Sequence, residues 1–226
     1  MEKITKEFYV YDFNELNEDV KKKLIEKERD RQRENYCDCY LEDDLVYKAK
    51  ELLQKYFGIT DNNLNVYYDL SYSQGNGAMI EFDINIEDLN NKYKIFSEEE
   101  MRFIQDKGII NNIRVRHNDN YYCHEYTFGI DSDYVYSIDY DYEDIKDEYD
   151  ISENDFNTLE DRLDDLLIDS DKHYTKSEFV KDIISMNKEL VARGYENIEY
   201  YDNCSNEEII SYLEDYKYLE NGEVYE

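Results

Sequence analysis

The chain has 226 residues, of which 57 are acidic and 26 basic, so its formal charge at pH 7 is −31. A surface this negative repels nucleic acid and anionic membranes and attracts proteins with basic grooves. The 26 Tyr, nine Phe and absence of Pro argue against disorder, because disordered acidic chains lack aromatic residues. With no 18-residue apolar run and no leader-like N-terminus, the sequence predicts a soluble cytoplasmic protein.

The first part of the chain predicts two helices. Asn17 is an expected N-cap followed by two acidic residues, and no helix breaker occurs before about Asn35. A second helix is expected from Leu41 to Phe57, because apolar residues recur there at helical spacing. Gly58 is placed to end this helix.

A β-hairpin is expected next. Apolar and polar residues alternate over residues 66–72 and again over residues 80–86, which predicts two antiparallel strands. The predicted turn motif between them is Gln74, Gly75, Asn76 and Gly77. Two glycines around an Asn suit a backbone with positive φ, and the two amide side chains offer hydrogen-bonding groups at the tip. The alternative is a turn that serves geometry alone.

A helix and three strands are expected after the hairpin. Ser97 and Glu100 form a capping box, so a helix should begin there and end near Gly108. The further strands are predicted at residues 110–117, 121–130 and 133–142.

From Ser152 onward the sequence predicts helices. Ser152, Thr175 and Ser205 each precede an acidic residue three positions later, which is typical of a helix start. Gly194 is expected to end the middle helix. Within residues 159–167 the leucines mark one face and the aspartates the other.

The predicted order is helices, then strands, then helices. This order indicates an α+β fold with an antiparallel sheet meander, flanked by N-terminal helices and a C-terminal helical region. We expect residues 1–150 to form the α+β core and residues 151–226 to form a helical region packed on the same unit.

The acidic excess is concentrated late in the chain. Residues 131–226 hold thirty acidic and eight basic residues, and residues 131–155 hold eleven acidic residues opposed only by Lys146. If residues 134–142 form a strand, alternate carboxylates lie roughly 6.7 Å apart, a spacing comparable with that of nucleic-acid phosphates. The alternative is an acidic surface that serves only solubility. The predicted partner-binding residues are Asp139, Tyr140, Asp141, Tyr142, Glu143, Asp144, Asp147 and Glu148.

Metal and catalytic chemistry have little support in the sequence. A calcium loop would need Gly where Asp144 stands, which leaves at most a weak surface cation site. Two cysteines separated by one residue do not have zinc-ligand spacing, and no nucleophile or P-loop motif occurs. We expect no metal, no cofactor and no enzymatic activity. Free thiols in a reducing compartment are expected for Cys37, Cys39, Cys123 and Cys204.

Three blocks carry a resemblance to known proteins. They are residues 10–21, which include Tyr11-Asp12-Phe13-Asn14-Glu15-Leu16; residues 73–78, Ser-Gln-Gly-Asn-Gly-Ala; and residues 205–222, with Tyr216 and Tyr218. These blocks resemble an uncharacterised family of phage and prophage proteins often labelled antitoxin-like. Family members often have Asp where this chain has Asn76, so the resemblance supports a conformational role for the turn rather than one that needs a carboxylate.

The resemblance implies a phage source and a bacterial host cytoplasm. Accessory phage genes commonly encode inhibitors of host defence, and the charge resembles that of DNA-mimic antirestriction and anti-CRISPR proteins. The leading hypothesis is an acidic inhibitor that occupies the basic groove of a CRISPR effector or restriction enzyme. The alternatives are an antitoxin or regulatory partner that neutralises a basic toxin, an enzyme or metal-dependent protein, and direct nucleic-acid contact through residues 21–33.

Overall fold

A computed structural model gives the architecture. It describes residues 7–60, 63–71, 76–118, 123–133, 138, 140–166 and 177–225. The chain forms two compact units, one made of Met1–Glu42 with Tyr195–Glu226 and the other of Asp43–Gly194. The expected boundary at residue 150 falls inside the second unit. In the described ranges, no helix combines the length and apolarity needed to cross a membrane.

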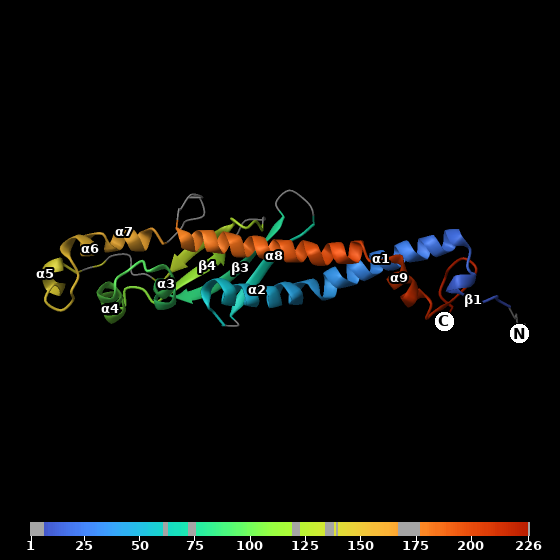
Figure 1. Ribbon diagram of the computed structural model, residues 1–226, viewed down its shortest axis with the longest axis horizontal. Helices are drawn as coiled ribbons and strands as arrows, with labels where there is room; N and C mark the ends of the chain where they lie inside the picture. The colour runs from blue at the N-terminus through green and yellow to red at the C-terminus, as the bar shows by residue number, and fades with distance from the viewer. Residues whose placement is uncertain are drawn as a thin grey trace, which may run out of the picture. The chain divides into compact units, whose positions relative to one another are not determined.

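The first unit joins the two ends of the chain (Figure 1). Its helices are α1 (Glu18–Cys39), α9 (Asn206–Leu213) and the last part of α8 (Glu178–Asp202), and its strands are β1 (Tyr11–Asp12) and β6 (Lys217–Tyr218), linked by an antiparallel pairing. The short 3-10 helix η1 (Phe13–Glu15) follows β1. The core of this unit contains Phe13, Leu16, Cys204, Ile209, Leu213 and Tyr218.

Two predicted helix starts in the first unit are confirmed. The Asn17 side chain accepts a hydrogen bond from the Asp19 N–H at 2.9 Å, so α1 begins where its N-cap was expected. The helix continues past the predicted end near Asn35 to Cys39. Ser205 and Glu208 form the capping box of α9.

The second unit is built on a four-stranded sheet. Its strands are β2 (Leu64–Asp69), β3 (Gly77–Asn85), β4 (Asn112–His117) and β5 (Phe128–Ser132), paired in that order and all antiparallel. This confirms the α+β fold with a meander. The strand predicted at residues 121–130 begins later than expected, because residues 123–127 form a turn in which the Thr127 hydroxyl donates to the His124 carbonyl.

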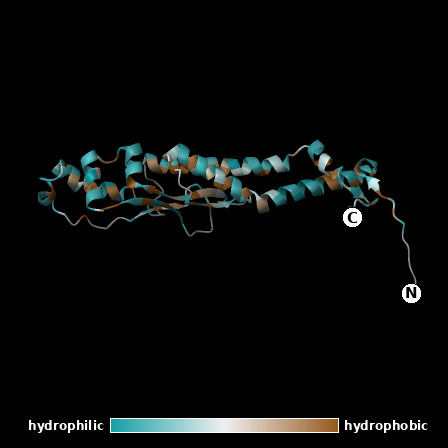
Figure 2. Cartoon of the chain, turned by 90° about the horizontal axis from the view of Figure 1, so that it is seen from below, coloured by the Kyte–Doolittle hydropathy of each residue, from teal (hydrophilic) through white to brown (hydrophobic). Residues whose placement is uncertain are grey.

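Helices cover one face of this sheet (Figure 2). They are α2 (Leu41–Phe57) and the part of α8 that belongs to this unit, while α3 (Ile86–Tyr93) directly follows β3. The Phe57 ring lies 5.2 Å from the ring of Phe82 on β3 and 5.7 Å from the ring of Phe179 on α8. Asn187 of α8 is fully buried and accepts a hydrogen bond from the Ile80 N–H at 3.1 Å, which ties the helix to the sheet.

Helix boundaries at α2 and α4 (Glu98–Asp106) follow the sequence signals. α2 ends before Gly58, which adopts a φ of 71° that favours glycine. The capping box of Ser97 and Glu100 opens α4, which ends two residues before Gly108. Both predictions are confirmed. The sequence could predict these boundaries because cap hydrogen bonds join residues that are close together in the chain.

The prediction that Gly194 ends a helix is wrong. α8 continues through Gly194 to Asp202. A Cβ atom at Gly194 would lie 2.4 Å from Cδ1 of Leu70 and 3.4 Å from Cδ2 of Leu45, so the glycine permits close packing of the helix. At the other end of α8, the Ser177 hydroxyl accepts the Val180 N–H at 3.3 Å, whereas the expected start at Thr175 lies outside the described residues.

Half of the predicted strand at residues 133–142, namely residues 134–137 and 139, lies outside the described residues. None of the described residues in that range is paired in a sheet, and α5 (Tyr142–Ile145) is helical. Asp133 directly follows β5. Its carboxylate accepts the backbone N–H groups of Asn111 and Asn112 at 2.9 and 3.0 Å, and the described pairing of β4 with β5 ends at Ser132. Two more short helices follow, α6 (Glu153–Asn157) and α7 (Leu159–Asp164).

Candidate functional site: an acidic surface on three short helices

An aromatic cluster around Phe103 of α4 packs the segment that contains α5, α6 and α7 against the rest of the second unit. The Phe103 ring makes edge contacts with Tyr140 at 5.8 Å, Tyr149 at 5.2 Å and Phe156 at 5.8 Å. Tyr149 is only 2 % exposed, and Phe103 is fully buried. The apolar side chains of this segment therefore point inward and leave its polar residues at the surface.

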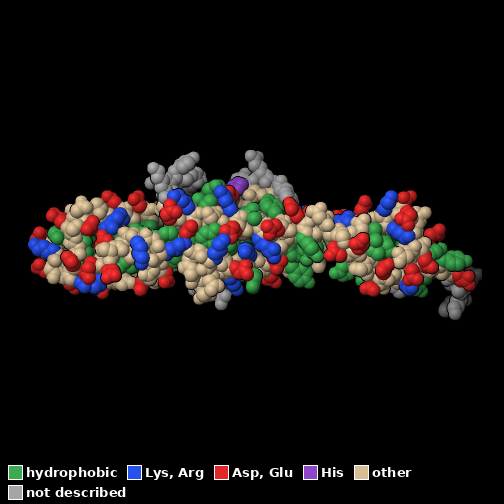
Figure 3. Space-filling model, in the orientation of Figure 1, with side chains coloured by type: hydrophobic (Ala, Val, Ile, Leu, Met, Phe, Trp, Pro, Cys, Tyr) green, Lys and Arg blue, Asp and Glu red, His purple; other side chains and the backbone are tan. Residues whose placement is uncertain are grey.

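Residues 141–165 hold twelve acidic and two basic residues, a balance of −10, and all twelve acidic residues are exposed. Acidic side chains are red in Figure 3, and some of them are visible over this part of the molecule. We call these twelve residues the acidic surface. They are Asp141, Glu143, Asp144, Asp147, Glu148, Asp150, Glu153, Asp155, Glu160, Asp161, Asp164 and Asp165.

Both basic residues in this segment already have partners. Lys146 pairs with Glu143 one helical turn away. Arg162 turns inward to the carboxylate of Glu100, whose side chain is only 5 % exposed, and it also donates to the Asp155 carbonyl at 3.0 Å. No arginine in the segment is thus left to neutralise the outer carboxylates.

Two neighbouring bases among the described residues reach the acidic surface from outside the segment, and one of them, Arg102, donates to the backbone carbonyl of Glu148. Lys107 lies 3.5 Å from Glu148, and the Lys107 ammonium also lies over the rings of Tyr140 and Tyr149. In the part of the chain that the structure describes, Asp144 and Asp147 have no salt-bridge partner. Water and outside cations are therefore the available counter-groups for these carboxylates, and basic groups of a partner protein are attracted to them.

The predicted partner-binding residues share one segment but not the predicted geometry. Asp141 is the N-cap of α5, while Glu143 and Asp144 lie within it, and Asp147 and Glu148 lie in the turn that follows. Alternation along a strand is absent there, so the expected 6.7 Å spacing of carboxylates does not apply to these residues.

The remaining predicted residues of this segment are aromatic or undescribed. Tyr140 is 40 % exposed beside Phe103, and Tyr142 is half-buried with its ring 6.1 Å from that of Phe156. Tyr140 is therefore the tyrosine of this pair that offers more contact area to a partner. Asp139 lies outside the described residues.

The glycine of the turn motif has a different role from the one predicted. Gln74 and Gly75 lie outside the described residues, and Asn76 directly precedes β3. Gly77 is the first residue of β3, pairs with Asp69, and is not among the described residues with positive φ. A Cβ atom at Gly77 would lie 2.0 Å from the Cys123 carbonyl oxygen, so close approach of two backbones requires the glycine.

The cysteines and histidines do not form a metal centre in the described ranges. No three His, Cys, Asp or Glu side chains there are placed to hold a metal ion, and all four cysteines are free. Cys123 Sγ lies 3.8 Å from His117 Nε2. Burial, and then the charge of Asp69, raise the pKa of Cys123, which opposes its use as a thiolate nucleophile.

Sequence reasoning did not join the acids of α7 to this site. The leucine pattern predicts a helix with Asp161, Asp164 and Asp165 on its polar side, and Leu159 and Leu163 are indeed buried. The charge balance over residues 141–165 is the sequence feature that connects the two groups. No protein-family model, curated protein or solved structure matches the chain.

Proposed function

We propose that this protein is a non-enzymatic inhibitor whose acidic surface occupies the basic, nucleic-acid-binding groove of a bacterial defence protein, such as a CRISPR effector or restriction enzyme. The observation that carries the proposal is the set of twelve exposed carboxylates, whose own segment supplies two basic side chains that are both already paired. The phage context comes from the resemblance of the three sequence blocks.

Electrostatics and contact chemistry both favour a protein partner. A concentrated negative surface speeds encounter with a Lys/Arg-lined groove and penalises nucleic acid and acidic proteins. Tyr140, at the edge of the acidic surface and 40 % exposed, adds an amphipathic ring of the kind enriched at interfaces. Because the carboxylates are exposed, the attraction should weaken with salt, over a screening length of about 10 Å at 0.1 M.

The test is charge reversal at Asp144, Asp147, Asp161 and Asp164, four exposed residues with no salt bridge among the described residues, each changed to Lys. The wild-type protein is expressed in bacterial hosts that each carry one CRISPR or restriction system, and phage plating efficiency is measured. We expect restored plating in at least one host, and loss of that protection in the variant.

A matched control separates the site from total charge. Glu26, Asp30, Glu34 and Asp38 are exposed on α1, and changing all four to Lys alters the net charge by the same amount. This control should protect as well as the wild type does. Protection that survives reversal of the acidic surface, in a variant with an unchanged circular-dichroism spectrum, contradicts the proposal. Protection only against a co-expressed basic toxin would favour the antitoxin alternative.

A further inference from the structure

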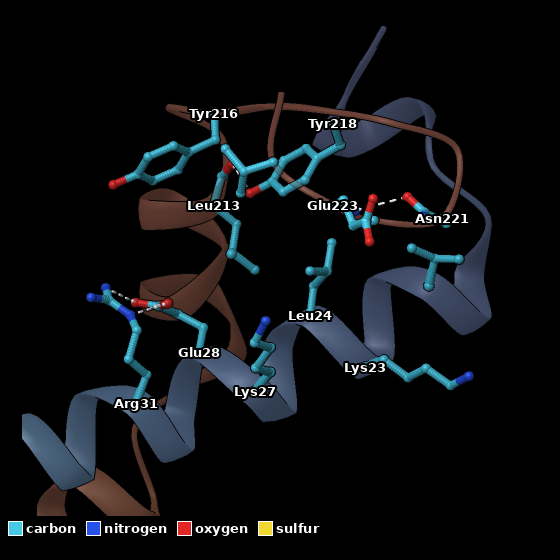
Figure 4. Close-up of a pocket in the computed structure, with 13 residues that line it drawn as sticks. Lys23, Leu24, Lys27, Glu28, Arg31, Leu213, Tyr216, Tyr218, Asn221 and Glu223 are labelled. Atoms are coloured by element: carbon cyan, nitrogen blue, oxygen red, sulfur yellow. Dashed lines mark hydrogen bonds and ion pairs between the residues drawn. The ribbon is translucent and has the colours of Figure 1, made fainter. Parts of the chain in front are cut away.

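The first unit contains a pocket of about 530 Å³ between α1, α9 and the C-terminal residues (Figure 4). Leu24, Leu213 and Tyr218 line its interior, and the last two of these side chains are buried. The turn at Gly222 closes one side, because a Cβ atom there would lie 2.8 Å from Cγ1 of Val20. The volume falls in the range of roughly 300–1,000 Å³ that is typical of ligand sites.

Basic side chains line the α1 wall of this pocket. Lys23, Lys27 and Arg31 follow one another at intervals of four residues, which places them on one face of the helix. In Figure 4, Lys27 projects from α1 toward the space below Leu213 and Tyr218, while Lys23 extends along the outer edge. The basic residues outnumber the acidic ones at this pocket, in a chain where acids are twice as frequent as bases.

The two acids at the pocket leave the lysines available. Glu28 is bound by Arg31 through two contacts of 2.6 and 2.8 Å and by Gln32 at 3.0 Å, and the bond from Arg31 is the main cause of its lowered pKa. Glu223 is exposed on the C-terminal turn. Neither Lys23 nor Lys27 has a salt bridge within the described ranges.

A second pocket, of about 230 Å³, adjoins the first at Arg31, which lines both. Its walls are tyrosines: Tyr36 and Tyr201 stack at 4.6 Å, and Tyr40 and Tyr212 are 55 % and 56 % exposed. From Val20 to Tyr36 the two pockets follow α1 over sixteen residue-to-residue steps, roughly 24 Å at the helical rise. About seven residues of an extended peptide have that length.

We infer that this surface, which we call the α1 groove, binds an extended segment of a partner polypeptide that carries both apolar and acidic side chains. An apolar side chain fills the larger pocket against Leu24 and Leu213. Carboxylates of the segment pair with Lys23 and Lys27, and the exposed tyrosines contact its remaining residues. The length of the groove favours a polypeptide over a small molecule, and the excess of basic lining residues favours an acidic one.

The α1 groove belongs to the first unit and shares no residue with the acidic surface. Its partner segment is acidic, whereas the partner proposed for the acidic surface is basic. The inference therefore goes beyond the proposed function, and either one can fail while the other stands.

The probe is a library of random nonapeptides displayed on yeast and selected for binding to the full-length protein. We expect selected peptides to be enriched in Asp or Glu together with Leu, Ile or Phe. Reversal of both lysines, Lys23→Glu with Lys27→Glu, should weaken their binding at least about tenfold, because two attractions become repulsions. Both side chains are exposed, so the fold should be unaffected.

The matched control is Lys22→Glu with Lys50→Glu, which makes the same change in net charge at two exposed lysines that do not line the groove. It should alter peptide affinity by less than about twofold. Selection that enriches no peptide overturns the inference, and so do peptides that bind the Lys23 and Lys27 double variant as tightly as the wild type.

Discussion

Replacing Arg162 with Met should destabilise the protein by about 2–4 kcal/mol. Arg162 is 29 % exposed, but its partner Glu100 is only 5 % exposed. Removing one member of a buried ion pair typically costs about 3–5 kcal/mol, because the other charge is left uncompensated. Because Arg162 is partly exposed, water can reach the space that its guanidinium leaves, so the expected cost is lower than for a fully buried pair. The Ser97 N–H, at 2.7 Å, remains as a donor to the Glu100 carboxylate.

Methionine is the suitable replacement, because it keeps an unbranched apolar chain and removes the guanidinium, which lies over the Phe96 ring at 5.5 Å. The measurement is urea-induced unfolding followed by far-ultraviolet circular dichroism and extrapolated to water. Lys181→Met serves as the control. It breaks a pair with Glu178 in which the two side chains are 56 % and 72 % exposed, and such surface pairs contribute about 0–0.5 kcal/mol.

A double-mutant cycle separates the pair from other effects of the substitution. With Glu100→Gln in place, no buried charge remains, so Arg162→Met should cost only about 1 kcal/mol, and the coupling energy should be about 1–3 kcal/mol. Equal losses for Arg162→Met and Lys181→Met, or strictly additive effects in the cycle, would refute the conclusion that Arg162 is committed to the interior.

Two further predictions concern the sheet. Gly77→Ala should cost about 1–3 kcal/mol in urea unfolding, because its Cβ would meet the Cys123 carbonyl at 2.0 Å; an unchanged midpoint would show that the two backbones can separate freely. Glu81→Gln should cost about 1–2 kcal/mol at pH 7. Burial opposes the charge of Glu81, but bonds from Arg114, Asn65 and the His117 N–H together lower its pKa below 4.5. The stabilisation by the Glu81 carboxylate is thus present above pH 4.5 and is lost as the pH falls through the lowered pKa, so the difference between variant and wild type should shrink as the pH falls below 4.5. A constant difference would contradict this.

Local chemistry made several helix boundaries predictable. The caps at Asn17, Ser97 and Ser205 each satisfy a backbone N–H two or three residues away, so the pattern alone contains all the interacting groups. Gly58 is similar, because its positive φ follows directly from its place after the last helical turn. Such interactions need no knowledge of the tertiary fold.

The failures depend on residues far apart in the sequence. Gly194 resembles a helix stop, yet its role depends on Leu70 and Leu45, which only the tertiary packing brings near. At the end of β5, the Asp133 carboxylate binds the backbone N–H groups of Asn111 and Asn112, which lie 22 and 21 positions away and which the local pattern of residues does not reveal.

Each candidate site likewise has features that the sequence could predict and features that it could not. The acidic residues from Asp141 to Glu148 can be identified in the sequence. Their exposure to solvent is expected, because charged side chains are rarely buried. The sequence does not predict that Arg162 points inward, because its partner Glu100 lies 62 positions away. For the α1 groove, the spacing of Lys23, Lys27 and Arg31 was available, but the C-terminal residues that close the pocket were not.

The fold also changes what the charge of −31 means. Residues 1–42 carry twelve acids and nine bases, and residues 195–226 carry ten acids and one base; the structure joins these two stretches in one unit. Arg33 of α1 pairs there with Asp202 at 3.0 Å. An acid of the C-terminal stretch is therefore opposed by a base of α1, whereas the two bases within residues 141–165 leave Asp144 and Asp147 without a salt-bridge partner among the described residues. Since an attraction to basic partners depends on unopposed charge rather than total charge, these unpaired carboxylates support the proposal that such a partner binds at the acidic surface.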